Sequence, residues 1–197
     1  MKKVLLSAVA LFAFGFANAQ ESTSAAGFSK GDVFVSGGVG ISSTKTGDAK
    51  TNGFNFSPKA GYFVTENIAV GLALGFASTK DEDDTKDTNF SAGAFGRYYF
   101  TPSSQFSVFG QLGVNMNNTK HEEVIGGTTF EAKANGFDVK LAPGISYFVS
   151  DHFAIEATFG ALGYETSKPD ADGAESTDTF GLNLNLDSIN FGLVYKF

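Results

Sequence analysis

The chain has 197 residues, among them 24 Gly, 22 Phe and four Pro, and it contains neither Cys nor Trp. The lack of Cys excludes a disulfide framework and a thiolate metal site. Without the first 19 residues, 12 basic residues stand against 21 acidic ones, a net charge of −9 that argues against nucleic-acid binding.

The amino-terminal residues have the pattern of a secretory signal. Met1–Lys3 is positively charged, Val4–Phe16 is apolar, and Ala17-Asn18-Ala19 is a small-x-small cleavage site. The apolar run is too short for a membrane helix, which needs roughly 20 residues. A buried helix is the alternative, but the segment has no capping residue and no polar face. We predict that residues 1–19 are removed after Ala19, which leaves one domain over residues 20–197.

Segments of alternating apolar and polar residues follow in chain order and predict β-strands. The clearest alternation is in 68–77, where Leu72 and Leu74 alternate with Ala and Gly. The predicted strands cover residues 32–43, 54–64, 68–77, 89–100, 106–116, 137–149 and 153–164, followed by an eighth that ends at Phe197. In the seventh strand Phe159 is expected to face outward and Leu162 inward.

The eighth strand has an irregular alternation. Large side chains occupy odd positions from Ile189 to Phe197, whereas Phe180, Leu182, Leu184 and Leu186 occupy even ones. A β-bulge near Asp187-Ser188 would reconcile the two phases, and it is the interpretation we favour. Alternatively, residues 180–186 belong to the preceding loop.

The connectors alternate in length, as those of an outer-membrane barrel do. Three near 65–67, 101–105 and 149–152 are short, and four are long and polar, near 43–53, 78–88, 118–136 and 165–179. With both termini in the periplasm, the long connectors become extracellular loops. A tilted strand of eleven residues spans roughly 28 Å, enough for an apolar band of about 25 Å. No later stretch is long enough for a membrane helix, so we predict an eight-stranded antiparallel up-and-down transmembrane β-barrel.

Aromatic side chains gather at both ends of the outward face, where they predict two interfacial girdles. The periplasmic girdle comprises Tyr62, Tyr98, Phe100, Phe106, Tyr147, Phe153, Tyr195 and Phe197. The extracellular girdle comprises Phe54, Phe56, Phe76, Phe90 and Phe137.

The opposite face carries charges and rings that we expect inside the barrel. The predicted interior charges are Lys59, Arg97, Asp138, Lys140 and Glu156. Arg97 and Glu156 lie at matching depths, so an ion pair between them is expected, with Lys59 and Lys140 as the alternative partners of Glu156. A soluble lipocalin-like barrel is the structural alternative, but it requires a polar exterior and an apolar interior. Inward aromatic rings should fill the space beside the small face of the third strand; they are Phe34, Phe63, Phe95, Tyr99, Phe109 and Phe148.

Three motifs carry a family resemblance over the whole mature chain: Gly61-Tyr62-Phe63, Arg97-Tyr98-Tyr99-Phe100 and the Phe-ended last strand. They resemble the small outer-membrane barrels of the OmpA transmembrane-domain and OmpX type, within the porin family. The resemblance implies the bacterial outer membrane, a lipid and lipopolysaccharide environment, and Tyr195 and Phe197 as a signal for the barrel-assembly machinery. The chain lacks the interfacial Trp of many such barrels, and its end at Phe197 leaves no room for a periplasmic peptidoglycan-binding domain.

Three functional classes follow. We expect a non-catalytic barrel that anchors four acidic surface loops, with a role in envelope integrity or surface interaction and with possible surface ligands. The alternative is a narrow porin-like channel for ions or small solutes, although eight strands leave an interior only wide enough for side chains. A remote alternative is a lipid-modifying enzyme, for which His121 is the one candidate base at the surface, since His152 lies in a periplasmic turn.

Two acidic clusters in the long connectors are weak candidates for a metal site. Their best-placed ligands are Asp81, Asp83, Asp84, Asp170 and Asp172. The order Asp-x-Asp-Gly differs from an EF-hand loop and supplies too few fixed ligands. We therefore expect solvated loops with at most weak Ca²⁺ or Mg²⁺ association, and no cofactor.

Overall fold

The computed structural model describes residues 26–47, 49–183 and 189–197. The predicted signal, residues 1–19, lies outside them. The strands are β1 (Val33–Thr46), β2 (Ala49–Phe63), β3 (Ile68–Asp81), β4 (Lys86–Tyr99), β5 (Phe106–Ile125), β6 (Thr128–Phe148), β7 (Phe153–Thr158), β8 (Ala161–Pro169), β9 (Thr177–Asn183) and β10 (Asn190–Lys196). Within the described ranges, none of the secondary structure is a helix of the length and apolarity that crossing a membrane demands.

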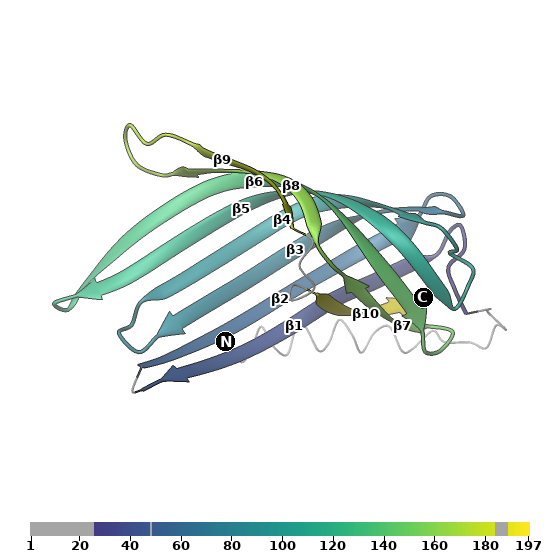
Figure 1. The fold of residues 1–197 in the computed structure, drawn as a ribbon, viewed down its shortest axis with the longest axis horizontal. Coiled ribbons are helices and arrows are strands. Elements are labelled where there is room, and N and C mark those ends of the chain that lie inside the picture. The colour runs from purple at the N-terminus through teal and green to yellow at the C-terminus, as the bar shows by residue number, and fades with distance from the viewer. Residues whose placement is uncertain (1–25, 48, 184–188) are drawn as a thin grey trace.

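Eight of these strands form a closed antiparallel ring (Figure 1). Around the ring the order is β5-β4-β3-β2-β1-β10-β7-β6, and pairing of β6 with β5 completes the circle. The carboxy-terminal strand closes it against the first, from Phe34 opposite Lys196 to Gly37 opposite Leu193. Strands β8 and β9 are not part of the closed ring but extend the seventh and eighth spans beyond it, where β8 pairs with the upper part of β6 and β9 pairs with β8. The predicted all-β, eight-stranded barrel is confirmed.

The two faces of the strands explain why this sequence forms a membrane-spanning ring. On β3, Leu72 is 69% exposed on the outer face, whereas Ala69 on the inner face is fully buried. In lipid an unpaired backbone amide is costly, and ring pairing satisfies these groups between strands. The outward apolar residues therefore meet the hydrocarbon, and the inward residues fill the lumen.

A bulge interrupts the seventh span at Phe159–Gly160. Thr158 lies opposite Gly144 and Leu162 lies opposite Leu141, so one residue more is used on this side than on β6. Gly160 has φ 62°, a left-handed conformation that glycine adopts without strain. The extra residue reverses the alternation, and the expectation that Leu162 faces inward is wrong. Leu162 is 39% exposed and shares the outer face with Leu141.

The eighth span is divided into β9 and β10. Phe180 and Leu182 form part of β9, where they lie opposite Tyr164 and Leu162 on the outer face. Residues 180–183 are therefore strand and not loop. The bulge predicted near Asp187-Ser188 falls outside the described residues.

The four long connectors are mostly strand, which corrects the expectation of extended loops. Strands β5 and β6 continue to Ile125 and Thr128 and meet at a tight turn, where Gly126 and Gly127 have φ 60° and 82°. In Figure 1 this hairpin reaches beyond the neighbouring ones. The apolar alternation stops at the membrane boundary, but pairing between polar residues continues past it. The sequence pattern therefore located the lipid-facing part of each strand and missed its extracellular part.

Candidate functional site

The periplasmic half of the lumen is filled by an aromatic cluster. All six rings expected inside are buried, at most 5% exposed, and they pack with Ala69, Ala154 and Val194. Small residues make room for them: a Cβ at Gly71 would lie 2.5 Å from the Phe95 ring. Side chains in tight contact therefore fill this half of the barrel.

A seventh ring comes from the segment before β1. Phe28 is 1% exposed, stacks on Phe63 with ring centroids 4.6 Å apart, and meets Phe148 edge-on at 4.8 Å. Its backbone N–H donates to the carbonyl of Pro102 at 2.7 Å. The adjacent Gly27 has φ +132°, and a Cβ there would lie 2.5 Å from the backbone of Ser103. The amino-terminal segment is thus held across the periplasmic opening.

The last strand holds this segment in place. The buried ammonium of Lys196 donates to the carbonyl of Gly27 at 2.6 Å and lies 3.9 Å from the carboxylate of Asp32. It also lies 5.3 Å from the centre of the Phe148 ring, in cation–π distance. We call the assembly of Gly27, Phe28 and Lys196 the periplasmic plug. The two ends of the described chain therefore close the same opening.

An ion pair lies directly above the aromatic cluster. Arg97 Nη1 and Nη2 donate to the two oxygens of Glu156 at 2.7 and 3.0 Å, a bidentate geometry. Arg97 also donates to Gln111 at 2.7 Å and to the Tyr99 hydroxyl at 3.0 Å. Its guanidinium lies 4.6 Å from the Phe109 ring centre. Both charged side chains are at most 5% exposed, so this network is buried inside the lumen.

The remaining predicted interior charges are Lys59, Asp138 and Lys140. Lys59 is half-buried on the inner face of β2. Asp138 is buried and accepts hydrogen bonds from Asn115 at 3.0 Å and Asn117 at 2.7 Å. Lys140 lies 3.5 Å from both Asp138 and Glu165. Asn117, Lys140 and Glu165 line a polar cavity of about 200 Å³ in the extracellular half of the barrel.

At the extracellular rim a histidine, His121, lies beside a carboxylate, Asp87. His121 Nδ1 lies 2.7 Å from a carboxylate oxygen of Asp87 on the neighbouring strand. This hydrogen bond raises the pKa of His121 above its ordinary value. The other histidine is at the periplasmic end, where His152 Nδ1 is 2.8 Å from the carbonyl oxygen of Lys196. The two imidazoles therefore belong to opposite ends of the barrel.

The candidate metal ligands are spread along the rim. Asp81 accepts a hydrogen bond from Thr51, and Asp84 forms a salt bridge with Lys80 at 2.7 Å. The Lys80 ammonium lowers the pKa of Asp84 by hydrogen bonding and by its charge. Asp170 and Asp172 line a shallow pocket by the β8–β9 turn, and Asp83 is exposed. In the described residues, no three acidic or histidine side chains converge into a group that could hold a metal ion.

Sequence reasoning missed Phe28 and Lys196. Phe28 precedes the first alternating segment, so periodicity gives it no partner. Lys196 occupies an inward position of the last strand, and this position could have identified it from the sequence as an interior charge. The outward Tyr195 and Phe197 pack edge to face at 5.0 Å.

The closed ring with an apolar exterior and a charged interior defines a transmembrane β-barrel. Residues 7–197 match the family model of the outer membrane protein beta-barrel domain, and the chain belongs to this family. It is therefore a protein of the bacterial outer membrane.

Several solved structures of outer membrane proteins are similar to this chain. A major outer membrane protein from Thermus thermophilus is 13% identical, with a TM-score of 0.50 over 84% of this chain and 98% of that chain. OprG from Pseudomonas aeruginosa is 16% identical, with a TM-score of 0.48 over 87% and 98% of the two chains. Ail of Yersinia pestis is 18% identical, with a TM-score of 0.44 over 85% and 99%. A comparison with curated proteins gave no match.

Proposed function

We propose that this protein is a non-catalytic and non-conducting barrel, which anchors four hairpins at the cell surface for envelope integrity or for contact with surface ligands. The observation that carries the proposal is the double closure of the periplasmic half. The periplasmic plug covers the opening, and the Arg97–Glu156 pair lies above it. A lumen sealed in this way supports a structural role over the channel alternative.

The surface chemistry of the protein then resides in the hairpins. The strands use residues dictated by lipid and by the interior, whereas the hairpins carry both acidic clusters and the turns. Specific recognition by rigid scaffolds is usually located in such connecting segments. Insertion through the barrel-assembly machinery, with Tyr195 and Phe197 as the signal, belongs to the same proposal.

The enzyme alternative finds little support in the geometry. A nucleophile requires a base within hydrogen-bond reach. His121 is engaged by Asp87 at an exposed position, and His152 faces a backbone carbonyl at the other end. Lipid deacylation or proteolysis by the purified barrel that is lost in His121→Ala would revive this class.

The experiment replaces both acidic clusters, at residues 81–87 and 170–178, with Ser and Asn in the full-length protein. We expect normal folding, measured by heat-modifiable mobility in gels, together with altered surface association or altered dependence on divalent cations. A control variant replaces Lys30 and Glu66 at the periplasmic end with Gln. If the rim variant fails to fold, or if binding and envelope integrity both remain unchanged, the hairpin-centred proposal is wrong.

A further inference from the structure

Seven strands carry an outward lysine at the same height above the membrane. On each, the lysine lies four residues beyond a large apolar side chain of the outer face, toward the extracellular end, and a small uncharged polar residue lies between them. We call these residues the lysine belt: Lys45, Lys50, Lys80, Lys86, Lys120, Lys133 and Lys168. The strand β9 is the exception, with Asp178 two residues from Phe180.

Strand register shows that the belt is continuous around this side of the barrel. Lys45 lies opposite Lys50, Lys80 opposite Lys86, and Lys120 opposite Lys133. The spacer residues pair in the same way, as Ser78 does with Thr88. The lower row is apolar, with Phe76 opposite Phe90. The outer face therefore has three successive rows of side chains, which are apolar, neutral polar and cationic.

The height of the belt matches the headgroup layer. Four residues of a tilted strand rise about 10 Å. The polar zone on each side of a bilayer is roughly 5 to 8 Å thick. A lysine can lay its aliphatic stem down toward the apolar boundary and keep its ammonium among the headgroups. The belt is thus placed where lipid phosphates lie.

The belt concentrates positive charge on an acidic protein. It holds seven of the 12 basic residues that remain after the first 19 residues are removed. Like charges directly opposite each other destabilise a sheet. On the outer face, Asp84 binds Lys80, while Glu122 and Glu131 bind Lys86, Lys120 and Lys133. No salt bridge joins Lys45, Lys50 or Lys168 to a carboxylate of the residues that the structure describes.

We propose that the lysine belt is a binding site for the phosphate groups of lipopolysaccharide in the outer leaflet. The extracellular end faces this leaflet, and charge complementarity selects its anionic groups. The inference does not depend on whether the barrel conducts. It assigns a lipid-binding role to outward residues, three of which, Lys45, Lys50 and Lys168, form no salt bridge with a carboxylate of the described residues.

The test measures retention of bisphosphoryl lipid A by the purified mature protein in zwitterionic micelles, with dephosphorylated lipid A and phosphatidylglycerol as comparison lipids. Each belt lysine should contribute roughly fivefold to affinity at low salt. The variant Lys45→Gln/Lys50→Gln/Lys168→Gln, which leaves the salt bridges intact, should therefore lose about a hundredfold. The same three lysines changed to Arg should retain lipid A, and Lys30→Gln at the periplasmic end should behave as the unmodified protein.

Two results would overturn the proposal: equal retention of lipid A and either comparison lipid, or equal affinity of the Gln and unmodified proteins. If the Gln variant does not fold, a NaCl titration of the unmodified protein decides. Phosphate recognition requires retention to fall as salt rises, and retention that is independent of salt contradicts it.

Discussion

The bidentate contact between Arg97 and Glu156 is the interaction on which the interior depends most. A buried ion pair adds little relative to apolar packing, but loss of one partner leaves an uncompensated charge. The guanidinium of Arg97 is surrounded by the rings of Phe34, Phe95 and Phe109, which cannot replace the carboxylate as acceptors. Glu156 is therefore more important for stability than an exposed carboxylate of the same strand region.

We expect Glu156→Gln to lower the free energy of unfolding by about 3 to 5 kcal/mol. Urea titration in micelles, followed by gel mobility, measures this loss. Glu165→Gln is the control, because that side chain is 53% exposed and its effect should stay within about 0.5 kcal/mol. Equal urea midpoints for the two variants would show that the buried pair has no special role.

The contact between His121 and Asp87 makes the stability of the protein depend on pH. Because the hydrogen bond to Asp87 raises the pKa of His121 in the folded protein, its stabilising effect is complete below the unfolded pKa, near 6.5. The effect is lost as pH rises from there through the raised folded value. NMR titration of the imidazole should give a pKa above 6.5 that returns toward this value in Asp87→Asn. A pKa that Asp87→Asn leaves unchanged would rule out this contact in solution.

The short segment before β1 contributes a large buried side chain, Phe28, to the barrel core. Phe28 contacts rings from four places in the barrel, namely Phe34, Phe63, Tyr99 and Phe148. Because this ring is almost fully buried, its removal leaves a cavity that the rigid barrel cannot collapse. The segment is thus part of the core.

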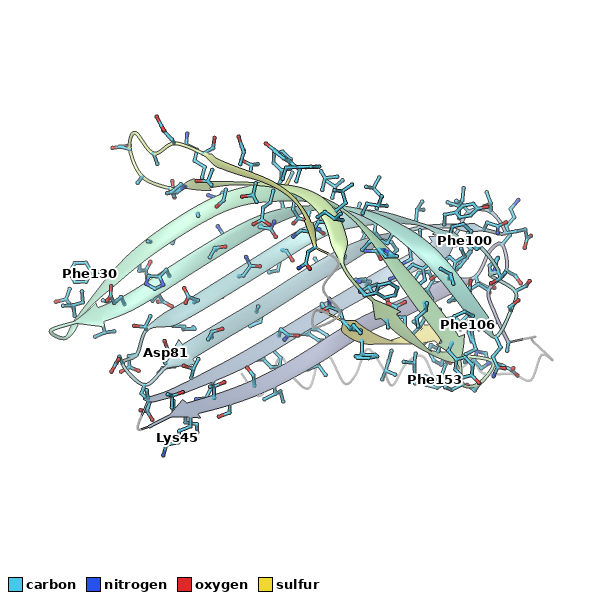
Figure 2. The ribbon with its side chains drawn as sticks, in the orientation of Figure 1. Lys45, Asp81, Phe100, Phe106, Phe130 and Phe153 are labelled. Atoms are coloured by element: carbon cyan, nitrogen blue, oxygen red, sulfur yellow. The ribbon has the colours of Figure 1, made fainter. Side chains whose placement is uncertain are left out.

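We expect Phe28→Ala to lower the free energy of unfolding by about 3 to 5 kcal/mol. Phe130→Ala is the matched control, since Phe130 lies near the tip of the β5–β6 hairpin and is 55% exposed (Figure 2). The control should change stability by less than about 0.5 kcal/mol. If Phe28→Ala behaves like the control in urea, the periplasmic plug does not contribute to the core.

At the scale of elements, the sequence locates the strands well because lipid imposes a strict two-residue period on one face. The depth of Arg97 and Glu156 relative to the short turns also follows from counting along each strand. The bulge at Gly160 could not be located in this way, since a single-residue shift leaves both neighbouring segments regular. The hairpin extensions lack an apolar face, and Phe28 lacks periodicity altogether.

For the whole molecule, closure is achieved by the last strand, which pairs with both β1 and β7. The carboxy-terminal residue, Phe197, has two expected roles, one in the folded barrel and one in its assembly. Phe197 N–H donates to the carbonyl of Val33 at 3.0 Å, and the ring packs on Tyr195. The same residue ends the pattern that resembles the assembly signal.

We expect deletion of Phe197 to reduce the amount of folded barrel in the outer membrane. The measurement is heat-modifiable mobility and surface labelling of cells at equal expression. Replacement of Phe197 by Tyr, which keeps an aromatic end, should preserve assembly. Normal levels of folded, surface-exposed protein after the deletion would refute the role of this residue.

In the function that we propose, the periplasmic plug and the Arg97–Glu156 network seal the lumen. Single-channel recording of the purified mature protein in planar bilayers tests this closure most directly. We predict a silent bilayer, without discrete conductance steps, although folded barrels are shown to be present by their gel mobility. Reproducible open-channel steps from the unmodified protein would contradict the sealed lumen and favour the channel alternative.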